Sequence, residues 1–313
     1  MAGRLRRPAA AALGLTAAGV LAWSTLVERQ LFTVRRHALP LLAEGAPPLR
    51  VLQLSDLHLA PWQSRKIRWV RALTALNPDL LVLTGDLMGH RDAKAGLVRA
   101  LAPLIESTPT VFVHGSNDYY GPIVKNPLKY LAEPSRKSTR TPDLDAAGLA
   151  AEFTNLGAID LNNSAARLVL RGTRLELLGL NDPHIRYDDA SAMRDALATI
   201  YAEDGVDGPE PESLRVGVVH APYQAALGEL LDDGAQLILA GHTHGGQVRV
   251  PGVGALTANC DLPTAQARGL SVWYDAHRAA FLNVSAGLGN SIYAPVRFAC
   301  RPEASLLTLE APR

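Results

Sequence analysis

Short apolar runs that end in polar residues recur along the chain. The clearest run, residues 236–240, stops at Gly241 and is followed by His242 and His244. A short apolar run closed by glycine is typical of a buried strand that ends in a turn. Four further runs end in Asp, Asn or His in the same manner, at residues 50–55, 80–84, 110–114 and 214–219. The pattern predicts buried strands with polar side chains at their ends.

Helical spacing alternates with these strand-like runs. Ile67, Val70, Leu73 and Leu76 recur every three residues, which predicts a helix over residues 64–76 that packs on a sheet. The pattern also predicts helices over residues 94–105 and 144–156, and strands over residues 166–170, 174–180, 247–250, 280–284 and 304–309. Alternating strands and helices indicate an α/β fold.

The predicted strand ends carry candidate metal ligands. His242 and His244 are two residues apart on a predicted loop, which lets both imidazoles converge on one centre. Histidines also fill protein cores, and a lone pair of this kind is compatible with a proton-linked surface pair. The other strand ends favour a metal site because they add ligands of the same class, namely Asp56, His58, Asp86, Asn117 and His220. Such a set suits Mn, Fe or Zn, and the sequence has no thiolate cluster for a structural zinc site.

These polar blocks resemble those of the calcineurin-like metallophosphoesterases. Their order and approximate spacing match across about residues 50–250, in the blocks Asp56-x-His58, Gly85-Asp86, Gly115-x-Asn117-Asp118, His220 and Gly241-His-Thr-His244. The membrane-associated bacterial branch of that superfamily also carries Gly-His-Thr-His-Gly-Gly-Gln and a late segment that corresponds to residues 287–291 and 295–298 here. That branch includes phosphodiesterases and UDP-diacylglucosamine diphosphatase-like members. The resemblance implies a two-sheet β-sandwich flanked by helices.

The resemblance also implies a binuclear metal centre. Asp86 would bridge two cations about 3.5–4 Å apart, and water between them would lose a proton near neutral pH to give a hydroxide that attacks phosphorus in line. One metal would take Asp56, His58 and His244, and the other would take Asn117, His220 and His242.

One block departs from the family pattern. The family's common third block is Gly-Asn-His, in which the histidine protonates the leaving group, whereas Asp118 follows Asn117 here. Read without a gap, the block puts Ser116 at the asparagine position and Asn117 at the histidine position. A carboxylic acid beside two cations has a lowered pKa, which makes Asp118 a poor acid at neutral pH. The catalytic candidates are Asp118 and His184, and the substrate itself is a further proton source.

Further polar residues are candidates for substrate binding. Asn290 and Arg297 follow the pattern of the membrane-associated branch, and Arg297 would either grip a phosphate bidentately or form a surface or interdomain ion pair. Asp182 and His184 would either contact substrate or cap a turn. The basic segment 119–142 is either a solvated loop or a lid over a phosphate-bearing substrate.

The N-terminal segment differs from the rest of the chain. Residues 8–27 are uncharged and rich in Ala, Leu, Gly and Val, and Arg4, Arg6 and Arg7 precede them. A helix of this length spans the roughly 30 Å hydrocarbon core of a bilayer, and the arginines would keep the N-terminus in the cytoplasm and the catalytic domain outside. A buried soluble helix and a cleaved signal peptide are the alternatives. We expect a membrane anchor or signal segment over residues 1–30, a linker over 31–48 and the metallophosphoesterase catalytic domain over 49–313.

Composition adds a few limits. With 48% hydrophobic and 19% charged residues the chain resembles an ordinary globular protein, and its net charge of +1 gives no support to a nucleic-acid partner. Cys260 and Cys300 form either one bridge outside the cytoplasm or two free thiols.

The sequence therefore predicts a metal-dependent phosphoric ester hydrolase with two Mn, Fe or Zn ions. Its substrate would be a phosphate ester or diphosphate of a lipid or envelope molecule. A nuclease or cyclic-nucleotide phosphodiesterase on the same site, and a non-catalytic metal-stabilised binding protein, are the alternatives.

Overall fold

Two six-stranded sheets form the body of the protein in the computed structural model, which describes residues 6–124, 140–206, 208 and 213–312. The first sheet has the order β1-β14-β2-β3-β4-β5, in which β2, β3 and β4 run parallel and β14 runs antiparallel to β2. Its strands are β1 Thr33–Pro40, β2 Leu49–Leu54, β3 Leu80–Thr84, β4 Thr110–Val113, β5 Ile159–Asp160 and β14 Glu303–Glu310.

The second sheet has the order β12-β13-β9-β8-β7-β6. Its inner strands β13, β9, β8 and β7 run parallel, and the edge strands β12 and β6 are antiparallel to their neighbours. Its strands are β6 Ser164–Leu170, β7 Thr173–Leu180, β8 Leu214–Val219, β9 Leu237–Ala240, β12 Gly269–Tyr274 and β13 Ala279–Val284. The expected α/β fold with a two-sheet sandwich is confirmed.

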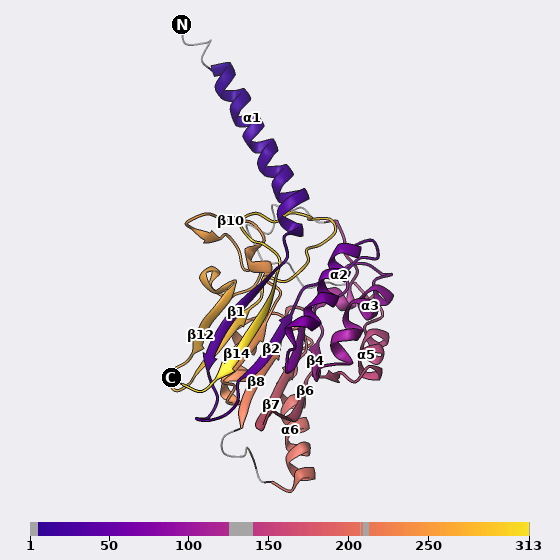
Figure 1. Cartoon of the computed structure of the whole chain (residues 1–313), viewed down its shortest axis with the longest axis vertical. Helices are drawn as coiled ribbons and strands as arrows, with labels where there is room; N and C mark the ends of the chain where they lie inside the picture. The colour runs from indigo at the N-terminus through magenta and orange to yellow at the C-terminus, as the bar shows by residue number, and fades with distance from the viewer. Residues whose placement is uncertain (1–5, 125–139, 207, 209–212, 313) are drawn as a thin grey trace.

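The sheets pack face to face, and helices cover their outer faces (Figure 1). One apolar cluster joins Val51 and Val82 of the first sheet to Val216 and Leu239 of the second. Outside the first sheet lie α2 Ser64–Ala72, α3 Lys94–Ile105 and α5 Ala146–Asn155, and outside the second lie α6 Ala190–Asp204 and α7 Gln224–Asp232. Parallel strands covered on both faces need apolar residues throughout, which explains why β3 is buried at every position.

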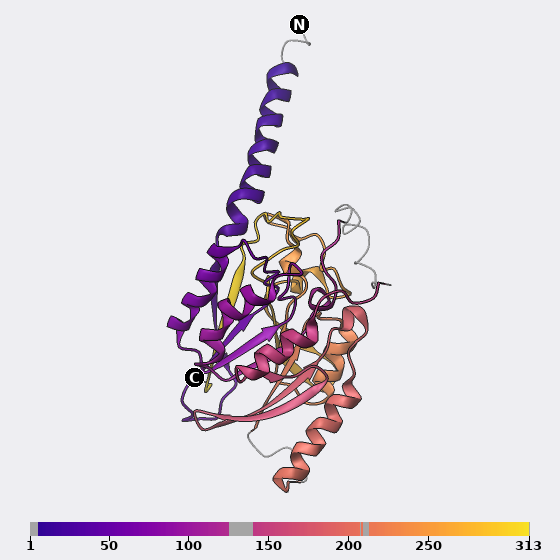
Figure 2. The same cartoon turned by 90° about the vertical axis from the view of Figure 1, so that its right-hand side faces the viewer.

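The N-terminal helix α1, Arg6–Ala22, projects from this body (Figures 1 and 2). The chain continues as a π-helical turn, Trp23–Val27, and a 3₁₀ turn, Glu28–Gln30. We expected a membrane-spanning helix over residues 8–27, but no helix in the described part of the chain is both long and apolar enough to cross a bilayer. The regular α-helix stops at 17 residues because the hydrogen-bond pattern widens at Trp23.

Part of the expected linker belongs to the folded body. Within residues 31–48, strand β1 pairs with β14 in parallel over its whole length, from Thr33 opposite Glu303 to Pro40 opposite Glu310. Leu39 is buried in the cluster between the sheets. The sequence pattern missed this strand because β1 lies at a sheet edge, where exposed polar residues alternate with few apolar ones.

Candidate metal centre

Tight turns after three strands, β2, β3 and β9, present five of the predicted ligands. Asp56, His58, Asp86, His242 and His244 all have positive φ angles, of 48°, 39°, 53°, 67° and 51° respectively. Residues other than glycine rarely adopt this left-handed conformation, and they keep it only where the surrounding structure imposes it. Strain of this kind gathers at functional sites, and five of the seven predicted ligands adopt it here, together with seven other non-glycine residues of the described chain.

Four of these side chains converge on one point. The ligand atoms of Asp56, His58, Asp86 and His244 all lie within 4.8 Å of one another. His58 Nε2 is 3.4 Å from Asp86 Oδ2 and 3.2 Å from His244 Nε2. His244 Nε2 is in turn 3.6 Å from Asp56 Oδ1. Two carboxylates and two imidazoles at these distances could hold a metal ion.

A second group of candidates lies on the other side of Asp86. His220 Nε2 is 3.5 Å from Asp86 Oδ1. Asn117 donates two hydrogen bonds to the same carboxylate, from its backbone N–H at 2.7 Å and from its side-chain amide at 2.6 Å. The ring of His242 packs against that of His220, with centroids 5.3 Å apart. Asp86 therefore touches residues of both predicted ligand sets.

Sequence reasoning missed one contact of His242. The His242 Nε2 atom lies 3.1 Å from the backbone oxygen of Asn259 and 3.2 Å from its side-chain amide. Asn259 lies in a loop outside the polar blocks, and no sequence pattern marks it as part of the site.

The electrostatics of the cluster fit a bound cation. Burial raises the pKa of Asp56 to about 7 and lowers the pKa of His58 to about 4. Burial would also raise the pKa of Asp86, but His220 beside it holds that pKa well below its usual range. His220 Nε2 is buried without a hydrogen-bond partner. Buried carboxylates, the His58 imidazole that its lowered pKa keeps uncharged, and the unpaired Nε2 of His220 are groups that a divalent metal would satisfy.

Two glycines leave room for the carboxylates. A Cβ atom on Gly115 would collide with Asp86 Oδ1, and one on Gly287 would lie 2.5 Å from Asp56 Cβ. Gly287 also has a φ of 68°, which disfavours any other residue. The glycines of the sequence blocks therefore serve close approach to the ligands.

The two catalytic candidates have different surroundings. Both oxygens of Asp118 accept backbone N–H groups, from Leu87 at 2.8 Å, Met88 at 2.9 Å and Gly115 at 3.0 Å. These contacts hold the turns together and occupy the carboxylate. The ring of His184, in contrast, lies beside that of His242, with centroids 4.6 Å apart, and its Nδ1 is 2.9 Å from the Tyr223 hydroxyl.

Asp182 has a capping role in the structure. Its Oδ1 accepts a hydrogen bond of 2.9 Å from the backbone N–H of His184, at the start of a 3₁₀ turn. Burial raises the pKa of Asp182 to about 7. Most of the basic segment 119–142 lies outside the described residues.

The two candidates for substrate binding, Arg297 and Asn290, have different surroundings. Arg297 is fully buried, and it donates to the backbone oxygens of Ala286 at 2.7 Å, Gly287 at 3.2 Å and Cys300 at 3.3 Å. Both terminal nitrogens of Arg297 therefore bond loop carbonyls, its Nε is buried without a hydrogen-bond partner, and the described residues form no ion pair with it. Asn290 donates to Ser291 O and Ala294 O and lines a cavity.

The two cysteines are free, buried thiols. Cys300 Sγ donates to the backbone oxygen of His244 at 3.3 Å, which ties the late loop to the ligand turn. The alternative of one bridge therefore does not hold in this structure.

Comparison with known proteins assigns the family. The model of the calcineurin-like phosphoesterase family matches residues 49–246. The chain belongs to the calcineurin-like phosphoesterases. All seven predicted ligands lie within the matched span, and membership makes the protein a metal-dependent phosphoric ester hydrolase.

Several curated proteins are similar to this family member over most of its length. The phosphodiesterase YaeI of Escherichia coli is 27% identical over 286 residues, which cover 89% of this chain and 88% of YaeI. The uncharacterized protein YpbG of Bacillus subtilis is 25% identical over 282 residues, with coverage of 89% and 88%. A bovine transmembrane protein with a metallophosphoesterase domain is 26% identical over 318 residues, which cover 97% of this chain but 63% of the bovine protein.

Proposed function

We propose that this phosphoesterase uses two metal ions to hydrolyse a phosphodiester or diphosphate of a lipid or envelope molecule. The position of Asp86 carries the proposal of two ions, because one oxygen faces His58 at 3.4 Å and the other faces His220 at 3.5 Å. A carboxylate between two ligand groups is the arrangement that bridges a pair of cations. Mn, Fe and Zn suit this donor set.

The surrounding contacts orient the imidazoles for this role. His220 Nδ1 lies 2.7 Å from the backbone oxygen of Thr84, which leaves Nε2 directed at Asp86. His244 Nδ1 lies 3.1 Å from the backbone oxygen of Gly289, which leaves Nε2 directed at Asp56. A backbone acceptor on one ring nitrogen fixes the tautomer and presents the other nitrogen as a ligand.

When bound, the cations supply a water activated for attack on phosphorus and neutralise charge on the phosphoryl oxygens. The protein's own residues position the phosphoryl group and handle the leaving group's proton. We assign the proton to His184, since it lies beside His242 and its Nδ1 is held by the Tyr223 hydroxyl. The carboxylate of Asp118 is occupied by backbone donors and is less suited to this role.

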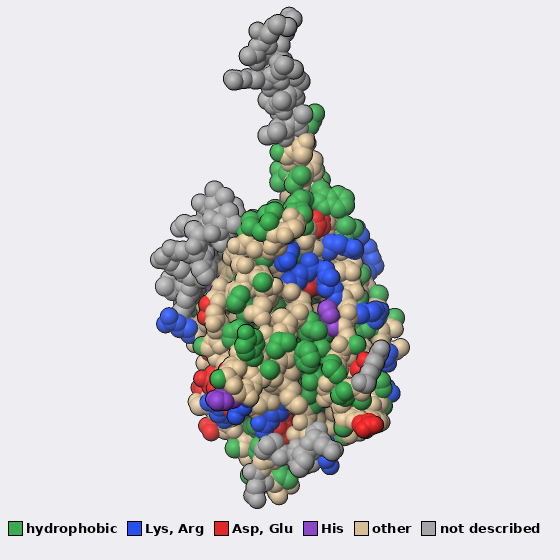
Figure 3. Space-filling view, turned by 90° about the vertical axis from the view of Figure 1, so that its left-hand side faces the viewer, with side chains coloured by type: hydrophobic (Ala, Val, Ile, Leu, Met, Phe, Trp, Pro, Cys, Tyr) green, Lys and Arg blue, Asp and Glu red, His purple; other side chains and the backbone are tan. Residues whose placement is uncertain are grey.

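The lipid substrate and an extracytoplasmic place at the membrane are supported by the N-terminal segment. Leu15, Leu21 and Leu26 expose 76%, 60% and 69% of their surface, and hydrophobic side chains cover the described stem of the projecting helix (Figure 3). Exposed apolar surface of this kind marks a contact with a partner or a membrane. The name of the similar bovine protein, a transmembrane protein with a metallophosphoesterase domain, supports a place at the membrane.

The proposal is tested by metal reconstitution of the full-length chain. Bis(4-nitrophenyl) phosphate and 4-nitrophenyl phosphate are the probes, and Mn, Zn or Fe is added after chelation. We expect hydrolysis of the diester to return with metal and to fall roughly 100-fold or more in His220→Ala, which removes a ligand. His277→Ala, a change at an exposed histidine, is the matched control. Equal activity in both variants would contradict the assignment.

A further inference from the structure

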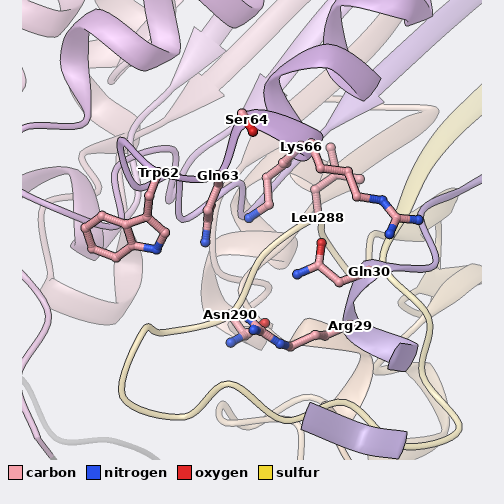
Figure 4. A pocket seen from close by; sticks show the side chains of 9 residues that line it. Arg29, Gln30, Trp62, Gln63, Ser64, Lys66, Leu288 and Asn290 are labelled. Atoms are coloured by element: carbon pink, nitrogen blue, oxygen red, sulfur yellow. The ribbon is translucent and has the colours of Figure 1, made fainter. Parts of the chain in front are cut away.

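A cavity of about 250 Å³ lies between the base of α1 and the start of α2 (Figure 4). Three cations line it, Arg29, Arg65 and Lys66, together with the amides of Gln30 and Asn290. The described residues that line it include no carboxylate. We call this cavity the cation pocket.

The cation pocket shares a wall with the metal centre. Lys66 Nζ donates a hydrogen bond of 2.6 Å to the backbone oxygen of Leu57, the residue between Asp56 and His58. On the other side, Gly289 separates the lining residues Leu288 and Asn290. Gly289 donates its N–H to the Asp56 backbone oxygen at 2.6 Å, and its own oxygen lies 3.1 Å from His244 Nδ1. The backbone at Leu57 and Gly289 therefore borders both the cation pocket and the metal centre.

The first turn of α2 carries positive charges, where negative charges usually stabilise a helix. Gln63 at the N-cap makes no side-chain capping bond, and the first turn holds no acid but contains Arg65 and Lys66. The N-terminal end of a helix carries partial positive charge, so cations there are unfavourable and anions are favourable. The arrangement lowers the stability of the free protein and favours an anionic ligand.

The donors of the pocket are largely unused by the protein. Lys66 is 6% exposed and makes a single hydrogen bond through an ammonium that has three donors. Arg65 has no hydrogen-bond or ion-pair partner in the described part of the chain. Arg29 uses its Nε to bond Thr25 O, which leaves its terminal nitrogens for a ligand. Buried or clustered cations without a counter-charge indicate that an anion completes the site.

The end of α1 fixes Arg29 in this place. The buried carboxylate of Glu28 accepts the backbone N–H groups of Ala299 at 3.1 Å and Cys300 at 2.6 Å, and the Trp23 indole N–H at 2.8 Å. These bonds attach the helix base to the loop that also supports His244. Arg29 is therefore held by the fold, and the exposed apolar stem of α1 begins next to the pocket.

We propose that the cation pocket binds a second anionic group of the substrate, such as the second phosphate of a diphosphate diester, while the hydrolysed phosphoryl group lies at the metal centre. This inference rests on the proposed phosphoesterase function. The cavity is smaller than the roughly 300 Å³ at which pockets for drug-sized ligands begin, so it suits a charged group and not a whole lipid. A lipid diphosphate and a soluble diphosphate share this group.

Kinetics on matched substrates test the inference. The probes are bis(4-nitrophenyl) phosphate, CDP-glycerol and CDP-diacylglycerol in mixed micelles, and the variant is Arg65→Gln in the full-length chain. We expect KM for both diphosphates to rise roughly tenfold while KM for the single-phosphate diester stays unchanged. Arg68→Gln, an exposed cation on the same helix outside the pocket, is the control and should match wild type.

A binding measurement on the metal-free protein provides a second readout. Without metal the centre presents buried carboxylates, so inorganic diphosphate should bind at the cation pocket. We expect calorimetry to show binding to wild type and Arg68→Gln, and at least tenfold weaker binding to Arg65→Gln.

Several results would overturn the inference. A KM increase that is equal for all three substrates, or that is confined to CDP-diacylglycerol, would show that the pocket does not bind a second phosphate. Hydrolysis of the aryl diester without turnover of CDP-glycerol, or absence of diphosphate binding, would remove the subsite and leave the proposed function intact. Absence of metal-dependent turnover of any ester would remove the proposed function itself.

Discussion

Consecutive residues of one turn perform different tasks. The Asn117 amide faces Asp86 of the metal centre, whereas the Asp118 carboxylate accepts from the backbone of its own turn at Gly115 and of the turn after β3 at Leu87. Both residues are polar and both follow β4, so residue type alone does not separate a ligand from a structural clamp. The direction of each side chain decides its role.

Asp118→Asn should destabilise the protein more than it slows catalysis. The new amide group would face the Gly115 N–H with a donor where Asp118 has an acceptor. We expect a loss of roughly 1–3 kcal/mol in the free energy of unfolding, with kcat at low temperature within a few-fold of wild type. Urea denaturation would measure the loss, and Asp92→Asn on the exposed surface is the control. Unchanged stability with a large fall in kcat would instead make Asp118 catalytic.

Lys66→Met should stabilise the protein in a pH-dependent manner. Burial, followed by repulsion from Arg297 and Arg29, lowers the pKa of Lys66 from 10.5 to about 7. Between these values the unfolded chain binds more protons, so the wild-type stability from this group rises with pH from about 7 toward 10.5. The penalty of the buried charge is therefore fully present below pH 7.

The methionine variant removes this penalty. At pH 7 it should unfold at higher denaturant concentration than wild type, by about 1–2 kcal/mol, and the difference should shrink as the pH approaches 10. Stability curves of the two proteins that run parallel across this range would show that Lys66 is not held with a lowered pKa.

At the scale of elements, strand β1 decides where the folded body begins. It forms the edge of the first sheet beside β14. The Leu39 side chain, which is 1% exposed to solvent, packs in the core between the sheets. The loop that follows residue 285 is also held by distant contacts. Arg297 donates to its backbone carbonyls, and the Glu28 carboxylate at the base of α1 accepts the Cys300 N–H. Segments distant in sequence thus support the same end of the sandwich.

Leu39→Ala should cost about 2–4 kcal/mol in the free energy of unfolding, because it leaves a void in a packed core. Arg36→Ala, at an exposed position of the same strand, should change stability by less than about 0.5 kcal/mol. Chemical denaturation of both variants measures the difference. Equal, small effects would mean that residues 33–40 behave as a linker in solution.

At the scale of the whole molecule, the two sheets bring the ligands together. Asp56 and Asp86 follow strands of the first sheet, whereas His220 and His242 follow strands of the second. The centre lies where both sheets end, so its formation requires the packed sandwich. Metal binding and global stability should therefore be linked.

Chelation should lower the melting temperature of the full-length protein, and readdition of Mn or Zn should restore it. A metal present at 100 times its dissociation constant stabilises the folded state by about 2.7 kcal/mol. Differential scanning calorimetry measures the shift, and a variant that lacks a ligand, Asp86→Asn, should respond little to metal. A metal-dependent shift of equal size in Asp86→Asn would place the ion elsewhere.

The sequence by itself determined the local events in this protein. Apolar runs that end in glycine or a polar residue predicted the strands and their turns, and the residue types at those turns predicted a metal-ligand set, because both depend on short-range pattern and side-chain chemistry. Only the tertiary structure decided which polar residues act in the centre and which support it. Arg297 became a buried clamp, β1 joined the sheet edge and the cation pocket formed between α1 and α2. Those outcomes depend on contacts between segments up to hundreds of residues apart, which no local pattern encodes.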